Sequence, residues 1–163
     1  MDKEERLGMV TNARTAEQRG HMTATLGKGE CPFCKVDEKI NKIIKEGVYW
    51  RMWHNPFPYP HHRQHIVIAS IKHINQLSKI PPQIGWELIE FLAWAEKEFG
   101  IPGGAFVMRF GSLEYNAGTL THLHAHIQVP DLTGPAMVVL KKIDPSQKES
   151  DTKEIITAFT QGA

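Results

Sequence analysis

The segment HLHAHIQV (122–129) places a histidine at every second position of an otherwise apolar stretch. A two-residue period is that of a β-strand, so His122, His124, His126 and Gln128 share one face and the apolar side chains share the other. The apolar face can cover a core, which leaves three imidazoles on a common surface. A solvated strand face usually carries Thr, Lys or Glu. The pattern therefore predicts a chemical role for this strand.

Four further segments are predicted to be strands. The run HIVIAS (65–70) is apolar and rich in β-branched residues, and the other three are also apolar or aromatic: 48–55, 105–110 and 136–143. Between the segments 48–55 and 65–70 lies NPFPYPHHRQ (55–64), whose three prolines predict an irregular loop.

Helices are predicted from apolar residues at helical spacing. One follows Cys34 and stops at Gly47, and a longer one opens at Pro81-Pro82 and ends at Gly100. An aspartate cap predicts a last helix over 151–159. With hairpin-like neighbours late in the chain, these elements predict an α+β domain with an antiparallel five-stranded sheet, a long helix and shorter helices.

The length and charge of the chain limit its organisation and its partners. Its 163 residues suffice for one domain with a buried core. Residues 1–30 are polar and predict a weakly ordered arm, in which a short amphipathic helix would fit, followed by a single domain over 31–163. The net charge of +1 gives no support for broad electrostatic binding to nucleic acid or to a membrane surface. Phosphate recognition must then be made by a local pocket.

The sequence also predicts a cytoplasmic location. No stretch approaches the ~20 apolar residues that a membrane span needs, and the start MDKEERLGMV lacks the apolar core of a secretion signal. The two cysteines both lie in ECPFCK, which suits a reducing compartment better than a disulfide framework.

Cys31 and Cys34 have the Cys-x-x-Cys spacing by which two thiolates bind one tetrahedral metal ion. Thioredoxin-like redox motifs share this spacing, and plain packing is a third interpretation. A redox motif follows a buried strand, whereas TLGKGE precedes this one, so metal binding is favoured. The candidates for two further ligands are His73, just beyond the 65–70 strand, and His122. Such a structural site would tie the N-terminal helix to the sheet.

The histidine strand itself permits three interpretations, because successive histidines on one face lie ~7 Å apart. In the first, His124 is a nucleophile toward phosphorus and its neighbours bind phosphate oxygens. In the second, the three histidines bind a catalytic metal together with a carboxylate. The third is a plain polar face. Neutral imidazole suits nucleophilic phosphoryl or nucleotidyl transfer, because Nε2 attacks well and leaves again when the phosphoramidate breaks down.

These segments together resemble the histidine triad (HIT) superfamily. HLHAHIQV is similar to its signature of histidines alternating with apolar residues, with Gln128 in an apolar slot. HIVIASIKH (65–73) looks like the family's strand between two histidines, and CPFC matches the cysteine pair of its zinc-bearing members. NPFPYP (55–60) is similar to a segment of the branch that includes diadenosine-tetraphosphate phosphorylases and galactose-1-phosphate uridylyltransferase. The resemblance covers residues 31–143, and its elements occur in the family's order.

The resemblance implies an HIT-like fold and a nucleotide hydrolase or nucleotidyl transferase that acts at the α-phosphate. The substrate would be a dinucleoside polyphosphate or an AMP-linked compound. His124 would form a nucleotidyl-histidine, and His126 would bind phosphate oxygens or protonate the leaving group. A structural zinc ion would be held by Cys31, Cys34, His73 and His122. Family members usually form homodimers through their long helix and sheet, so a homodimer is implied as well.

Further residues are assigned to the nucleotide by the same resemblance. Asn55 would bind ribose hydroxyls, His65 would face the same pocket, and Thr119 would hydrogen-bond phosphate or leaving group. The turn from Asn116 through Gly118 to Thr119 also offers N–H groups that suit an anion. Asn55 before a proline and Thr119 in a turn are explained equally well by local structure. His61 and His62 are most simply solvated loop residues.

Departures from the family pattern concern the substrate more than the nucleophile. Ala117-Gly118-Thr119 replaces Gly-Gln-Ser/Thr, and Pro130 is followed by Asp131 where the phosphorylase branch usually has arginine. Two other functions stay open from the sequence. One is a nucleotide-binding regulatory protein with negligible turnover, and the other is a metal-dependent enzyme with its metal on the triad.

Overall fold

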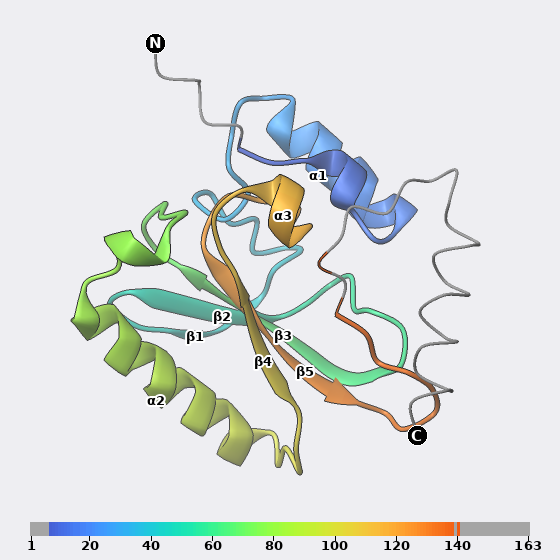
Figure 1. Cartoon of the computed structure of the whole chain (residues 1–163), viewed down its shortest axis with the longest axis vertical. Coiled ribbons are helices and arrows are strands. Elements are labelled where there is room, and N and C mark those ends of the chain that lie inside the picture. The colour runs from blue at the N-terminus through green and yellow to red at the C-terminus, as the bar shows by residue number, and fades with distance from the viewer. Residues whose placement is uncertain (1–6, 139, 141–163) are drawn as a thin grey trace.

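The structure is a computed structural model that describes residues 7–138 and 140. Five antiparallel strands form one sheet in the order β1-β2-β3-β5-β4 (Figure 1). The strands are β1 (Ile43–Glu46), β2 (Trp50–His54), β3 (His62–Ser70), β4 (Ala105–Arg109) and β5 (His124–Pro130). The helices are α1 (Ala16–Leu26), α2 (Pro82–Glu98) and α3 (Leu113–Asn116), with 3-10 turns η1 (Val10–Asn12) and η2 (Leu77–Lys79). The predicted α+β architecture with a five-stranded antiparallel sheet is confirmed.

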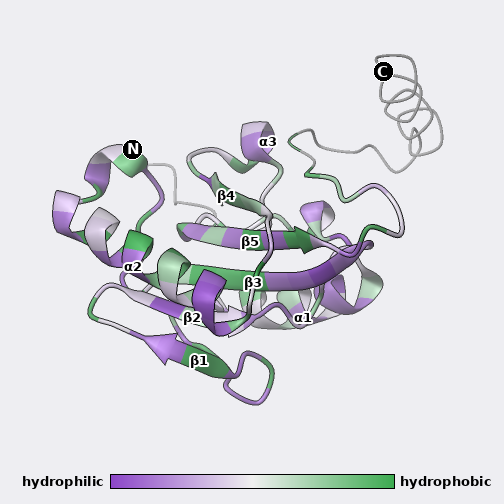
Figure 2. Cartoon of the chain, turned by 90° about the horizontal axis from the view of Figure 1, so that it is seen from below, coloured by the Kyte–Doolittle hydropathy of each residue, from purple (hydrophilic) through white to green (hydrophobic). Residues whose placement is uncertain are grey.

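Helix α2 covers one face of the sheet (Figures 1 and 2). It begins at Pro82, where the fixed φ of proline suits the first helical turn, and Gly100 follows it with a left-handed φ of 54°. Its buried stripe packs on apolar side chains of the sheet, and the two sets form the main core: Ile84, Leu88, Phe91 and Ala95 from the helix; Trp50, Met52, Ile66, Ile68, Leu123, Ile127 and Val129 from the strands and their ends. The predicted long helix is confirmed.

The opposite face of the sheet carries the site. Because side chains alternate along a strand, Ile66 and Ile68 point to α2 while His65, Val67 and Ala69 point away from it. On this second face Phe33 packs on Trp53, Val67 and Ala69. Helix α1 lies on the same side, since its residues line a pocket together with residues of β5. The sheet therefore separates the core from the site.

The predicted helix from Cys34 to Gly47 is wrong. Residues 43–46 form strand β1, which pairs with β2 so that Ile43 lies opposite Trp53 and Glu46 opposite Arg51. The isoleucines in this segment have helical spacing, but they are β-branched and satisfy a short strand equally well. Pairing with β2, a tertiary contact, decided between the two periods.

The turn between β1 and β2 is held by α2. The Glu87 carboxylate accepts hydrogen bonds from the backbone N–H groups of Val48 (2.7 Å), Tyr49 (2.7 Å) and Trp50 (2.9 Å). A Cβ atom at Gly47 would collide with this carboxylate and displace it from these hydrogen bonds. The Glu87 carboxylate of α2 thus stabilises the β1–β2 hairpin, which was not predicted from the sequence.

Other boundaries also differ from the predicted ones. Strand β3 begins at His62, so residues 62–64 of the predicted loop are extended. Strand β5 begins at His124, which leaves His122 just before the strand. Within the predicted strand 136–143, the described residues 136–138 and 140 are not in a strand, and the others lie outside the described residues, as does the predicted helix 151–159. The described residues nevertheless contain five strands, because β1 is a strand that was not predicted.

The described part of the N-terminal segment, residues 7–30, packs on the site. Residues 16–26 form α1, and Gly8 forms a β-bridge with Leu120. The buried side chain of Asn12 donates from Nδ2 to the carbonyl oxygens of Gly118 (2.8 Å) and Leu113 (3.3 Å). The expectation of weak order is therefore wrong for this part. The division into an arm over 1–30 and a domain over 31–163 stays a prediction.

Candidate functional site

His124 is held with a defined ring nitrogen toward the pocket. Its Nδ1 lies 2.7 Å from the carbonyl oxygen of His122. A carbonyl oxygen only accepts, so Nδ1 must carry the hydrogen and Nε2 keeps its lone pair. His124 lines the pocket and is buried. The strand thus presents an unprotonated nitrogen of the middle imidazole to the cavity.

His126 is oriented by a chain of hydrogen bonds from β3. The backbone N–H of Tyr59 lies 3.3 Å from Nδ1 of His65, which must accept from this donor, whereas Nδ2 of Asn55 lies at a similar distance from both ring nitrogens. His65 therefore carries its hydrogen on Nε2 and donates it to Nδ1 of His126 at 2.9 Å. His126 is left with its hydrogen on Nε2. This ring is arranged as a hydrogen-bond donor, the complement of His124.

Burial keeps these imidazoles neutral. Loss of hydration lowers the pKa of His65 to about 3 and that of His124 to about 4, and it lowers the pKa of His126 well below 6.5. Neighbouring charges act in the same direction, including the guanidinium of Arg109 on both His124 and His126. At neutral pH one ring can act as a nucleophile and the other as a hydrogen-bond donor.

One pocket is lined by two histidines of the triad and by side chains from distant parts of the chain. His124 and His126 form its floor, together with Val67 and Trp53 on the same sheet face. The remaining described lining residues come from the N-terminal segment, from the segments around the cysteines and Asn55, and from the region of Arg109 and the loop before β5: Asn12, Gln18, His21, Met22, Pro32, Phe33, Asn41, Asn55, Pro56, Phe57, Tyr59, Arg109, Ala117, Gly118, Thr119 and Leu120. Aromatic and amide groups beside a row of imidazoles suit a ligand with a ring and a polar end.

The predicted nucleotide residues are only partly brought together. Asn55, Gly118 and Thr119 line the pocket. His65 is not among the described lining residues and acts on the pocket through its bond to His126. Asn116 is also not among the described lining residues. Its Oδ1 accepts a hydrogen bond from the backbone N–H of Gly118 at 2.6 Å. That bond occupies one of the N–H groups that the turn was expected to offer an anion.

Arg109, a buried residue on the same sheet face, is not among the residues predicted from the sequence. Its register position on β4 is directly opposite His124, and it lines the pocket. The signal in the sequence was the two-residue period of the predicted strand, which puts Arg109 on one face with Ala105 and Val107 and away from Phe106 and Met108. The N-terminal contributions of Asn12 and Arg14 had no comparable signal, because they depend on long-range packing.

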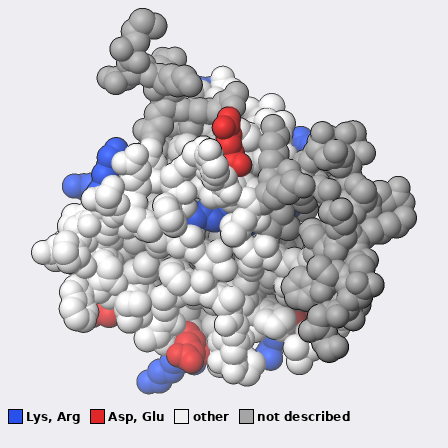
Figure 3. All heavy atoms as spheres, in the orientation of Figure 1, with Lys and Arg blue, Asp and Glu red and all other residues white. Residues whose placement is uncertain are grey.

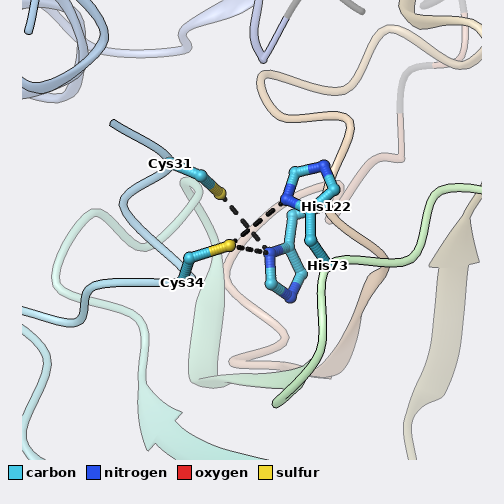
Figure 4. Close-up of side chains that lie close together, drawn as sticks. All are labelled: Cys31, Cys34, His73 and His122. Atoms are coloured by element: carbon cyan, nitrogen blue, oxygen red, sulfur yellow. Dashed lines mark hydrogen bonds between the residues drawn. The ribbon is translucent and has the colours of Figure 1, made fainter. Parts of the chain in front are cut away.

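Cys31, Cys34, His73 and His122 form a second cluster beside the triad (Figure 4). Their ligand atoms all lie within 4.8 Å of one another. Nδ1 of His122 is 3.4 Å from Sγ of Cys31 and 3.5 Å from Sγ of Cys34, and Nδ1 of His73 is 3.3 Å from the latter. Tetrahedral zinc with bonds of about 2.3 Å to sulfur and 2.0 Å to nitrogen would separate such atoms by about 3.6 Å. The donor set and its spacing fit zinc.

The protonation states in this cluster also fit a metal. Nε2 of His122 lies 2.6 Å from the carbonyl oxygen of Ser70 and so carries the hydrogen, which leaves Nδ1 to face the cysteines. Burial raises the pKa of the Cys31 thiol to about 11, so a thiolate there needs a compensating positive charge. His122 points to the cysteines and His124 to the pocket. The chain thus assigns adjacent histidines of the triad to different sites.

The surface shows no large charged region on the face in Figure 3, where the charged atoms of the described residues are few and scattered. Among the described residues, no helix has the length and apolarity that crossing a membrane requires.

Comparison with known proteins rests on solved structures. No protein-family profile matches the chain, and no curated protein matches it. An HIT family hydrolase from Clostridium thermocellum is 24% identical with a TM-score of 0.51, over 66% of this chain and 96% of that one. A Zn-bound histidine triad family protein from Mycobacterium smegmatis is 20% identical with a TM-score of 0.51, over 84% and 100% of the two chains. A histidine triad nucleotide-binding protein from Candida albicans is 14% identical with a TM-score of 0.51, over 82% and 100%.

The sheet, the helix that backs it and the histidine row define an α+β protein with an imidazole-lined pocket on one sheet face. The chain has the fold of the histidine triad proteins. The resemblance stated from the sequence is therefore confirmed for the fold. These likenesses do not single out the diadenosine-tetraphosphate phosphorylase branch.

Proposed function

We propose that this protein is a nucleotide hydrolase or nucleotidyl transferase that acts at the α-phosphate through a nucleotidyl-His124 intermediate. The observation that carries the proposal is the hydrogen bond from Nδ1 of His124 to the His122 carbonyl, which directs an unprotonated Nε2 into the pocket. The lowered pKa of this ring keeps it neutral at physiological pH. The histidine triad motif and the fold both support nucleophilic attack by His124 on the α-phosphorus.

The reaction would proceed in two displacements. The Nε2 lone pair of His124 forms a bond to the α-phosphorus, while the bond from that phosphorus to the leaving group breaks and its electron pair departs with the leaving group. His126 donates a hydrogen bond from Nε2 to the leaving atom or to a phosphate oxygen. Water or a second acceptor then attacks the phosphorus, and the electron pair of the P–N bond returns to His124.

Other pocket residues would bind and position the nucleotide. Asn55 and Thr119, which line the pocket, would contact the ribose and the phosphate or leaving group. His65 would be a positioning residue, because it fixes the tautomer of His126. Asn116 and Gly118 would shape the loop before the triad. The substrate would be a dinucleoside polyphosphate or an AMP-linked compound.

We propose structural zinc at Cys31, Cys34, His73 and His122. The fit of the four donor atoms supports this, and so does the zinc in the mycobacterial structure with the same fold. The ion would hold the segment around Cys31 against the sheet. The nucleotide chemistry would be carried by the neighbouring metal-free histidine. Two reduced cysteines in such a site agree with a cytoplasmic protein.

We also propose a homodimer. Strand β4 is an edge of the sheet, and Phe106 on it is 42% exposed. On the adjoining helix α2, Trp86 is 76% and Ile89 62% exposed. Ile89 and Phe106 line one shallow groove with Leu92. Apolar side chains beside an open strand edge are typical of a surface that is covered by another chain.

The proposal is tested by substitution and trapping. We expect His124→Ala to lower turnover of diadenosine tetraphosphate by about four orders of magnitude or more, since no other pocket group replaces the nucleophile. The Tm of His124→Ala should match that of wild type. The control is His61→Ala, at a residue outside the described pocket lining, which should keep wild-type turnover. Wild type mixed with α-³²P-labelled nucleotide should retain acid-labile label on His124. A wild-type chain that binds nucleotide but never becomes labelled would be a regulatory binding protein instead. Product analysis with and without inorganic phosphate distinguishes hydrolysis from phosphorolysis.

A further inference from the structure

Arg109 brings a positive charge to the wall of the histidine pocket. It stands opposite His124 in the β4–β5 ladder, and directly paired residues share a sheet face. The residue is only 6% exposed and lines the pocket. Since a guanidinium stays protonated, this charge is permanent. The proposed nucleophile therefore has a cation for its neighbour.

The guanidinium is held in place by the protein. Nη1 of Arg109 donates to the carbonyl oxygen of Asn116, and Tyr59 makes a side-chain hydrogen bond with it. Arg14 donates from Nη2 to the next carbonyl of the loop, that of Ala117, at 3.0 Å. Because arginine has five N–H donors in a planar fork, contacts to carbonyls are compatible with a contact to a ligand. Arg109 is thus pre-positioned beside the triad.

The other described side chains that line the pocket are apolar, aromatic, amide, hydroxyl or imidazole groups, and none is Asp or Glu. Arg109 is thus the one side chain of this described lining whose positive charge is permanent, and the described lining holds no carboxylate to offset it. In a site of low polarity such a charge acts strongly on the charge of a bound group.

We infer that Arg109 makes the pocket selective for nucleotides whose leaving group is itself a phosphate, over nucleotides whose leaving group is an amine. This inference rests on the proposed function and narrows its substrate class. When the bond between the α-phosphorus and the bridging oxygen breaks, the electron pair stays on that oxygen and the leaving phosphate gains negative charge, which the guanidinium stabilises. An amine leaving group instead takes up a proton as the P–N bond breaks, and a neutral or cationic amine gains nothing from a neighbouring cation.

A binding experiment tests the inference without turnover. The probes are AMP and α,β-methylene-ADP, which share the α-phosphate and differ by one further phosphonate. For the full-length wild type we expect the methylene compound to bind about 10- to 100-fold more tightly, the range for a hydrogen bond to a charged group. Arg109→Gln should bring the two affinities within about threefold of each other. Arg63→Gln, which removes an exposed arginine on β3 outside the pocket, should leave the wild-type ratio unchanged.

A comparison of two substrates by kinetics tests whether Arg109 contacts the leaving group. We expect Arg109→Gln to lower kcat/KM for diadenosine tetraphosphate by about 10- to 100-fold and that for adenosine 5′-phosphoramidate by less than about threefold. Arg109→Lys keeps the charge and loses the fork, so its losses should lie between wild type and glutamine. Thermal unfolding of each variant shows whether it is folded. If Arg109→Gln does not fold, the losses in kcat/KM of Arg109→Lys for the two substrates test the inference in its place.

The outcomes separate the inference from the proposed function. Equal wild-type affinity for AMP and the methylene compound would overturn the inference, as would a wild-type preference for the phosphoramidate. An equal loss for both substrates in Arg109→Gln would also overturn it, because Arg109 would then contact the shared α-phosphate. Absence of label on His124 and of turnover with either substrate would refute the proposed function, while the binding ratio would still judge the inference.

Discussion

At the scale of single residues, the chemistry of this protein depends on which nitrogen of each histidine carries the hydrogen. Backbone groups settle this for three rings. Carbonyl oxygens fix the hydrogen on Nδ1 of His124 and on Nε2 of His122, and the N–H of Tyr59 fixes it on Nε2 of His65. The three evenly spaced histidines of the triad therefore differ in their proposed roles: His122 as a metal ligand, His124 as the nucleophile and His126 as a hydrogen-bond donor.

A consequence of the buried neutral imidazoles is a stability that falls in acid. Folded His65 has a pKa of about 3, whereas the unfolded chain takes up a proton near pH 6.5, so protonation favours the unfolded state between these values. We expect His65 alone to lower the free energy of unfolding by about 2 kcal/mol between pH 7 and pH 5. Urea unfolding of wild type and His65→Gln at pH 5, 6 and 7, with zinc saturating throughout, measures this. The wild type should lose more stability than the variant, and parallel pH profiles would contradict the assignment.

At the scale of elements, the cysteine–histidine cluster connects three parts of the chain. The Cys31–Cys34 turn belongs to the segment after α1, His73 follows β3, and His122 precedes β5. The turn contacts the sheet mainly through Phe33, which packs on Trp53 and lies edge-on to His124 at 5.1 Å. A metal at the cluster would therefore hold a pocket wall against the triad.

Removal of zinc should destabilise the protein and loosen this wall. For Cys31→Ser we expect a loss of about 2–3 kcal/mol in the free energy of unfolding and a Tm lower by several degrees, because metal binding contributes to folding. Elemental analysis should give about one zinc per chain in wild type and less in the variant. A chelator should lower the Tm of wild type and of the control His61→Asn, but hardly that of Cys31→Ser. A metal-free wild type as stable as the purified protein would refute the site.

At the scale of the whole molecule, the sheet divides the protein into a core side and a site side. Helix α2 covers the core side, and the N-terminal segment covers the site side through the contacts of Asn12 and Arg14 with the loop before β5. The edge at β4 and the outer surface of α2 are left exposed among the described residues. This exposed apolar surface is where a second copy would bind.

The dimer is testable by one charge on that surface. We expect wild type to have the mass of two chains in light scattering, and Phe106→Glu to have the mass of one, because a buried carboxylate at the interface costs several kcal/mol. Tyr115→Glu is the matched control: Tyr115 is 84% exposed on α3, away from the groove that Phe106 lines, and its substitution should leave the mass unchanged. A monomeric wild type at micromolar concentration would refute the proposal.

Elements with a local pattern could be predicted from the amino-acid order alone. The alternation in HLHAHIQV and the apolar stripe from Pro82 each fit one period only, and the run at 65–70 is short and rich in β-branched residues, so the sheet, its backing helix and the imidazole row were predictable. The spacing of Cys31 and Cys34 indicated a metal site. His73 beyond one predicted strand and His122 at the start of another were the candidates for its other two ligands, and the family resemblance implied the same set.

Features that depend on contacts between distant residues became visible only in the folded chain. Residues 43–46 fit two periods, and their pairing with β2 made them a strand. Asn12 and Arg14 are polar residues in a polar segment, and only packing against Gly118 and Ala117 makes them part of the site. Arg109 acquires its role from its partner across the ladder, His124. Local patterns specify how a segment folds, but the neighbours that give a side chain its chemistry come from segments that can lie more than a hundred residues away.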